Sequence, residues 1–342
     1  MGALSYSMFP ENGEVHKKKT ITEALDIRNT WDRFDSGWYE KLAREGYPQR
    51  QFTDKDQETW GFMPLYPAVM SIVSGITGLS LFTSGLLISN FCTFLAMLFL
   101  YKLSEEKFGK GIRTVTLLMI SAGGFYLNIV YPSGLFVLLT TIVFYFSYKE
   151  KFAWALIIAG LASVTRIQGC LLLIIPGIEI LLKYRQSSYK FLPAVLLGLL
   201  PMISLMFYLY LTSGEPLAFI KIQHAWGSSD LFPLQGFLSV FSGVRPGGSL
   251  TNACFWVIIL GSVLYCYKRL PLSYIIFTVL YVLISTSNEL LYGSARYMLG
   301  MLPVFIAISI SPYYIRQIFI LINILFLSLM ISAFVTNTMT FL

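Results

Sequence analysis

The chain divides into a polar stretch, residues 1–60, and a long apolar remainder. Beyond residue 60, continuous apolar runs recur, and the short loops between them carry most of the lysines and arginines. Apolar and polar positions do not alternate within the runs, so the pattern favours membrane-spanning helices over the strands of a transmembrane barrel. We therefore expect an all-α polytopic membrane protein.

About ten runs are expected to cross the membrane, with every basic loop on one side. The runs cover residues 81–100, 114–130, 134–148, 152–164, 171–182, 191–211, 252–267, 271–287, 297–310 and 318–335. Because basic loops stay in the cytoplasm, the other, non-cytoplasmic side collects the remaining polar segments. These are the N-terminal segment and residues 131–133, 166–168, 212–250 and 288–296.

Three parts follow from this pattern. Residues 1–60 form a polar N-terminal segment that carries the candidate chemistry, residues 61–79 a re-entrant or interfacial helix, and residues 80–342 the transmembrane bundle with an outer loop at 212–250. Residues 61–79 are excluded from the crossings because the basic loops then alternate cleanly. The N-terminus would lie outside without a signal peptide, so either a first helix precedes it or residues 61–79 do cross.

Composition narrows the class further. Charged residues make up 13% of the chain, about half of what a soluble domain carries. The net charge of +7 comes from the loop lysines and arginines, so it does not indicate nucleic-acid binding. The four cysteines and two histidines have no metal-ligand spacing. We predict no cofactor. Asp32 and Asp35 lack an obvious third carboxylate, which favours chemistry without a metal, although a divalent metal is left open.

The segment 30–47, TWDRFDSGWYEKLAREGY, combines acidic and aromatic residues at the edge of the apolar body. A short helix is expected here, with Ser36 as its N-cap. Trp38, Tyr39 and Leu42 would form its apolar face. Water-facing carboxylates beside a lipid-embedded body indicate chemistry at a membrane surface.

Several motifs occur in a defined order along the chain. Residues 33–47 follow the pattern R-[WF]-D-[AS]-x-x-[YF]-x-x-[IL]-A-x-x-G-Y, and residues 62–67 follow F-x-P-x-[YF]-P. Shorter elements come later: YPSGLF at 131–136, Thr165-Arg166 with Gly169, Gln223 with Trp226, and Ser294-Ala295-Arg296-Tyr297. In this order they resemble the glycosylphosphatidylinositol mannosyltransferase 2 family (the PIG-V-like enzymes) and its prokaryotic relatives. The stretch 131–136 departs from the family's Y-S-E-S-L-F pattern.

The resemblance implies a GT-C fold and a glycosyltransferase. Enzymes of that class take a hexose, here mannose, from a polyprenyl- or dolichyl-phosphate sugar and invert the anomeric carbon. The acceptor hydroxyl would belong to a glycolipid, a glycan or a protein. The site would lie on the non-cytoplasmic face of the cell membrane in a prokaryote, or of the endoplasmic reticulum in a eukaryote.

An inverting transfer needs a carboxylate that takes the proton of the attacking hydroxyl. Asp35 lies inside the matched block and is the predicted general base, with Asp32 as second choice. The alternative is that Asp35 only caps the short helix. The leaving lipid phosphate needs cations, for which Arg166, Arg296 and His224 are the candidates. Snorkelling of the arginines to lipid headgroups and local packing of the histidine are the alternatives.

The predicted sugar or acceptor contacts are Trp38, Tyr39, Tyr66, Gln223 and Trp226. The aromatic residues among them are equally typical of an interfacial belt. A lipid-linked substrate transporter or flippase, in which Arg166 and Arg296 line the path of an anion, is the alternative function. Paired broken helices in both halves would favour it, but only one proline-broken segment is found.

Overall fold

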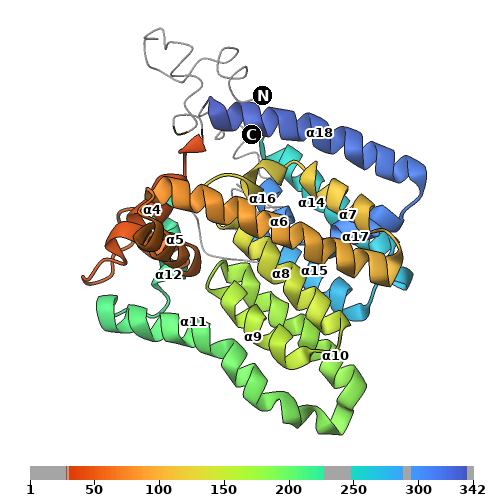
Figure 1. Ribbon diagram of the computed structural model, residues 1–342, viewed down its shortest axis with the longest axis horizontal. Coiled ribbons are helices and arrows are strands. Elements are labelled where there is room, and N and C mark those ends of the chain that lie inside the picture. The colour runs from red at the N-terminus through yellow and green to blue at the C-terminus, as the bar shows by residue number, and fades with distance from the viewer. Residues whose placement is uncertain (1–27, 29–30, 227–247, 288–293, 337–342) are drawn as a thin grey trace.

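The computed structural model describes residues 28, 31–226, 248–287 and 294–336, and every regular element in these residues is helical (Figure 1). The longer helices are α4 (Ser36–Glu45), α5 (Leu65–Thr77), α6 (Leu81–Phe108), α7 (Gly111–Met119), α8 (Ser133–Tyr148), α9 (Phe152–Ser163), α10 (Ile174–Tyr184), α11 (Leu192–Ser213), α14 (Gly248–Tyr265), α15 (Leu272–Ser285), α17 (Leu302–Ile310) and α18 (Tyr313–Val335). Shorter helical turns are η1 (Thr59–Gly61), η2 (Gly124–Leu127), η3 (Ile167–Leu173), η4 (Arg185–Phe191), α12 (Ala218–Lys221), η5 (Ile222–Trp226), η6 (Tyr267–Arg269) and α16 (Ser294–Met298).

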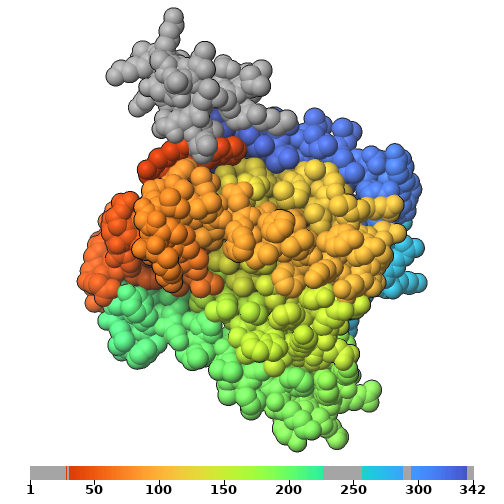
Figure 2. All heavy atoms as spheres, viewed as in Figure 1, coloured from red at the N-terminus to blue at the C-terminus, as the bar shows by residue number. Residues whose placement is uncertain are grey.

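The outer surface of the bundle has the character that a lipid environment requires. Three stretches are long and apolar enough to cross a membrane, Leu81–Phe108, Ile167–Ser213 and Tyr313–Val335, and shorter apolar helices accompany them. In the most apolar part of Ile167–Ser213 only 22% of the residues are buried. Helices α11 and α18 lie along opposite edges of the molecule and expose leucine, isoleucine and aromatic side chains (Figures 1 and 2). Soluble proteins rarely expose so large an apolar surface. The predicted all-α membrane bundle is therefore confirmed.

Two predicted crossings are each broken into two pieces. Residues 114–130 contain the end of α7 and then η2, and residues 297–310 contain the end of α16 and then α17. The first break occurs at Gly123, where two backbones come too close for a side chain. A methyl group on Gly123 would lie 2.0 Å from the carbonyl oxygen of Ala295. Hydropathy alone does not reveal such a contact, because a glycine in an apolar run is compatible with both a continuous and a broken helix.

The short helix predicted in the N-terminal part is present, with one difference at its start. Helix α4 starts at Ser36, so Asp35, not Ser36, is its N-cap residue. Helix α5 has 13 residues, which corresponds to about 20 Å, within the segment predicted to be re-entrant or interfacial. The division into three parts stays a prediction.

The C-terminal end of α18 packs on the segment that leads into α4. Phe334 is fully buried, and its ring lies 6.1 Å from Trp31, 5.4 Å from Phe34 and 6.3 Å from Tyr131. Aromatic pairs at these separations are favourable. The last helix and the first described residues of the chain therefore support the same loop, the one that ends in Asp35.

Candidate active site

Asp35 and Arg296 form an ion pair that joins two segments 261 residues apart in the chain, between Asp35 Oδ2 and Arg296 Nη1. The two side chains are 29% and 18% exposed, respectively. Although aspartate is a preferred N-cap residue, the Asp35 side chain makes no capping hydrogen bond to α4. The capping alternative therefore does not hold for this carboxylate, because its described partner is a guanidinium.

The backbone around Asp35 is held in an unusual conformation. Phe34 has φ +54°, in the left-handed region that residues other than glycine seldom adopt. Its ring packs on Phe334, which helps to maintain that conformation. The backbone N–H of Asp35 donates to the hydroxyl of Tyr131 at 3.1 Å. The carboxylate is thus positioned by contacts from α18 and from the residue that precedes the start of α8.

Arg166 lies directly before η3, and the motif Thr165-Arg166 with Gly169 explains its position. The backbone N–H of Gly169 donates to the carbonyl of Arg166 at 2.8 Å. A methyl group on Gly169 would lie 2.2 Å from the carbonyl oxygen of Ala162 at the end of α9. Glycine is therefore required for η3 to turn back on α9. That turn buries Arg166, whose Nη1 donates to the carbonyl of Arg296 at 3.3 Å.

Arg296 lies on α16, which is anchored by the first residue of its motif. The indole N–H of the fully buried Trp256 donates to the Ser294 hydroxyl at 2.9 Å. The Tyr297 ring then lies close to both cations, with its centroid 5.4 Å from the Arg166 guanidinium and 5.5 Å from that of Arg296. Such cation–π contacts favour burial of the charges.

Counted over the described residues alone, the charges at this site do not balance. Asp35 forms an ion pair with Arg296. No described carboxylate forms an ion pair with Arg166. Two arginines and one aspartate leave a net charge of one positive unit in a largely buried place. Because uncompensated buried charge is costly, this arrangement is suited to a ligand that brings a negative charge.

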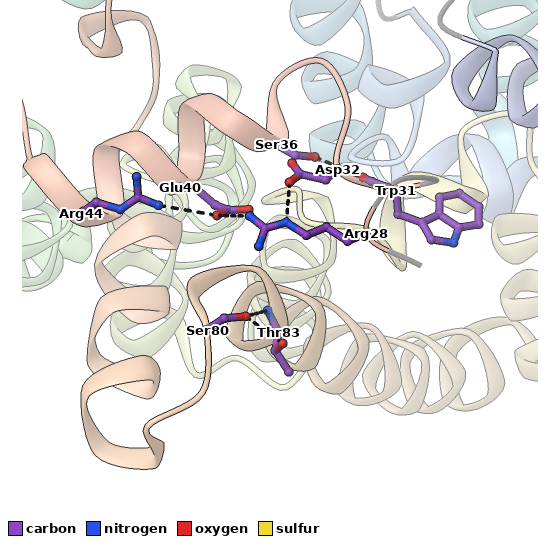
Figure 3. Close-up of polar contacts among 8 residues, drawn as sticks. All are labelled: Arg28, Trp31, Asp32, Ser36, Glu40, Arg44, Ser80 and Thr83. Carbon is purple, nitrogen blue, oxygen red and sulfur yellow. Dashed lines mark hydrogen bonds and ion pairs between the residues drawn. The ribbon is translucent and has the colours of Figure 1, made fainter. Parts of the chain in front are cut away.

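Asp32 belongs to a separate polar cluster (Figure 3). Its carboxylate pairs with Arg28 at 3.2 Å, and Arg28 also contacts the buried Glu40 at 3.3 Å. Arg44 approaches the same Glu40 oxygen at 3.9 Å. Burial, followed by the charge of Asp32, raises the pKa of Glu40, although Arg28 and Arg44 oppose that shift. Asp32 is thus occupied by Arg28, which favours Asp35 as the carboxylate of the arginine site.

The three predicted sugar contacts on α4 and α5 differ in accessibility. Trp38 is half-buried and stacks on Phe62 with ring centroids 5.9 Å apart. Tyr39 is buried; its burial, and then the nearby Asp35, raise the pKa of its phenol. Tyr66 is fully buried, and its hydroxyl bonds to the Gly85 carbonyl at 3.0 Å. The sugar-binding role stays a prediction for all three, and accessibility favours Trp38.

The remaining predicted residues lie on η5, which packs against η1. The Gln223 amide donates to the carbonyl of Phe219 at 3.3 Å, and His224 is exposed. The described contacts connect neither of them to Asp35. The side chain of Trp226 lies outside the described residues. Their roles in binding stay predictions.

Sequence reasoning did not select several residues of this site. Tyr131 and Tyr297 lie inside matched motifs, and both contact Arg296, so their motif positions were the available signal. Ser133, at the start of α8, has a buried hydroxyl without a partner among the described residues. Among the residues that the structure describes, no cluster of three histidine, cysteine or acidic residues is present. The expectation about a metal stays a prediction.

Comparisons with known proteins add a fold likeness. No family model matches the chain, and no curated protein matches it. Among solved structures, it resembles the Archaeoglobus fulgidus oligosaccharyltransferase in its apo form, with 14% identity and a TM-score of 0.47 over 94% of this chain and 55% of the other. The same enzyme tethered to an acceptor peptide gives 13% and 0.47 over 99% and 54%. The chain thus spans about half the length of that archaeal enzyme, and at this TM-score the likeness carries no argument about activity.

Proposed function

We propose that this chain is an inverting glycosyltransferase of the GT-C class. It would move a hexose, mannose by the family resemblance, from a polyprenyl-phosphate sugar to an acceptor hydroxyl at the non-cytoplasmic face of the membrane. The observation that carries the proposal is the cluster of one carboxylate, Asp35, with the buried Arg166 and the partly buried Arg296. The order of the motifs that supply these residues supports it further.

The two arginines suit the leaving group. When the glycosidic bond breaks, its electron pair passes to the lipid phosphate, whose negative charge increases. Guanidiniums already aimed at that position stabilise the transition state without rearranging, and arginine matches phosphate oxygens in a two-point contact. The net positive charge of the described residues at the site favours binding of the phosphate.

Asp35 suits the incoming group. The acceptor oxygen attacks the anomeric carbon opposite the phosphate, and Asp35 takes the hydroxyl proton as the new bond forms. In the structure Arg296 holds the carboxylate. A phosphate bound to Arg296 would compete for that guanidinium and leave Asp35 available to the acceptor. Donor binding would therefore prepare the base.

The proposal is tested by the products formed from a polyprenyl-phosphate mannose. The full chain, purified in detergent, is incubated with this donor and a panel of glycolipid, glycan and peptide acceptors, and the products are read by mass spectrometry. Transfer predicts free polyprenyl phosphate and glycosylated acceptor in equal amounts. Movement of the intact donor across vesicle membranes, without either product, would instead identify a transporter or flippase.

A further inference from the structure

One buried hydroxyl beside the two arginines has no acceptor for its proton among the residues that the structure describes. Tyr281, on α15, is fully buried; the Arg166 guanidinium lies within hydrogen-bonding reach of its oxygen, but the hydroxyl proton has no acceptor among the described residues. Nearly all buried polar groups in folded proteins have a partner, so an unsatisfied one requires an explanation. A ligand group that accepts this hydrogen bond is one such explanation.

Two close contacts locate this hydroxyl. A methyl group on Gly300 would lie 2.6 Å from the Tyr281 oxygen and 2.6 Å from an edge carbon of the Phe136 ring. The guanidinium of Arg166 lies over that same ring, 5.7 Å from its centroid. Arg166 also lies within side-chain hydrogen-bonding reach of the Tyr281 phenol. The hydroxyl therefore lies beside Arg166, at the positively charged site.

The surroundings define what the hydroxyl would bind. A phenol is an O–H donor, and both neighbouring guanidiniums are donors without acceptor capacity. A ligand that satisfies all three must present several acceptor oxygens and a negative charge, as a phosphate group does. A neutral sugar hydroxyl would gain nothing from the two cations.

We infer that Tyr281 is a third donor to the donor lipid's phosphate, beside Arg166 and Arg296. This inference rests on the proposed function, because it names a further contact of the same site. Its hydroxyl would donate to a non-bridging phosphate oxygen, which would supply the acceptor that the described residues do not. Hydrogen bonds to charged groups are stronger than neutral ones, so removing the hydroxyl should weaken phosphate binding without weakening the fold.

The same helix provides a matched control. Tyr274 lies seven residues earlier on α15, is buried, and also has a hydroxyl without a partner among the described residues. Seven residues are two helical turns, or about 10 Å along the axis. The ring of Tyr274 lies 4.8 Å from the Lys107 ammonium, away from Arg166. Tyr274→Phe and Tyr281→Phe therefore remove the same group from similar surroundings, and only one of the two lies at the arginine site.

The experiment measures binding of undecaprenyl phosphate and of undecaprenol, the same lipid without phosphate, to the purified full chain. For Tyr281→Phe we expect the phosphate to bind about tenfold more weakly, with binding of the alcohol unchanged. Thermal stability of the lipid-free variant should equal or exceed that of the wild type, because an unsatisfied buried hydroxyl is removed. Tyr274→Phe should leave both lipids' affinities unchanged.

Each other outcome overturns the inference. Equal phosphate binding by Tyr281→Phe would show that the hydroxyl does not reach the phosphate. An equal loss for phosphate and alcohol, or a variant that unfolds or melts lower without lipid, would assign the hydroxyl a structural role. If the wild type itself does not prefer the phosphate over the alcohol, the proposed donor site fails. If the wild type prefers the phosphate and transfers sugar, but Tyr281→Phe is normal, only this inference fails.

Discussion

Replacing Asp35 by asparagine separates the two roles that the site assigns to this carboxylate. Asparagine keeps the shape and one acceptor oxygen but loses the charge and most of the basicity. If Asp35 is the general base, its loss should lower turnover by about two to four orders of magnitude. If Asp35 also competes with the phosphate for Arg296, the same change should strengthen binding of the donor lipid.

The size of the second effect follows from Coulomb's law. A phosphate on Arg296 would lie on the order of 6 Å from the carboxylate, so with an effective dielectric constant of about 20 the repulsion is about 3 kcal/mol. The Asp35 side chain is 29% exposed and that of Arg296 18%, so screening by solvent reduces this figure. We expect a net gain of about 1 kcal/mol, or about fivefold in Kd.

The assay compares wild type and Asp35→Asn in one preparation. Binding of undecaprenyl phosphate is measured at low salt, and single-turnover transfer is measured with saturating donor. Asp32→Asn is the control, because Asp32 pairs with Arg28 instead. Weaker lipid binding by Asp35→Asn would refute the competition for Arg296. Turnover within a few-fold of the wild type would refute the general-base role.

The remaining predictions concern other parts of the site and the fold. Arg166→Lys keeps the charge but loses the planar two-point contact, so donor affinity should fall about tenfold in the same binding assay, and unchanged affinity would argue against a phosphate contact. Glu40 has a raised pKa because of its burial, so its contribution to stability is present at low pH and is lost as pH rises through the raised pKa; Glu40→Gln should remove this loss in melting curves recorded against pH. Glu58 has a lowered pKa, because hydrogen bonds from the Thr59 N–H and Lys41 outweigh the effect of its burial. The stabilisation that Glu58 provides is present above the ordinary pKa of 4.5 and is lost as pH falls through the lowered pKa. Glu58→Gln should therefore destabilise the protein at neutral pH, and equal melting curves for the Glu40→Gln and Glu58→Gln variants would contradict the assignment. Gly169→Ala should lower stability by about 1–3 kcal/mol and impair donor binding, because a methyl group there meets the Ala162 backbone, whereas Gly75→Ala, which faces open space in α5, should be neutral or stabilising by up to about 1 kcal/mol in thermal unfolding.

The sequence predicts the helices well because hydropathy and charge are local signals. Runs such as 81–100 and 318–335 correspond to α6 and α18, since a basic loop or a proline marks at least one of their ends. The break after α7 was not predicted, because it depends on the contact between Gly123 and the backbone of Ala295. No local pattern encodes a backbone contact between residues so far apart in the chain.

The candidate site shows the same division. Motif order selected Asp35, Arg166 and Arg296, and the structure brings all three together. The pairing of Asp35 with Arg296 could not be foreseen, because it joins the first and the last parts of the bundle. Tyr281 lies in an apolar run, where a tyrosine at the site has the same sequence signature as Tyr274 at a distance from it.

The central claim is that this site transfers a sugar from a lipid phosphate and uses Asp35 as the base. The most direct measurement is mass spectrometry of products from polyprenyl-phosphate mannose and its acceptors, with wild type and Asp35→Asn side by side. The account predicts that the wild type forms polyprenyl phosphate and glycosylated acceptor in equal amounts, while Asp35→Asn binds the lipid and forms almost none of either. Equal product from both proteins, or none from the wild type with every acceptor, would contradict it.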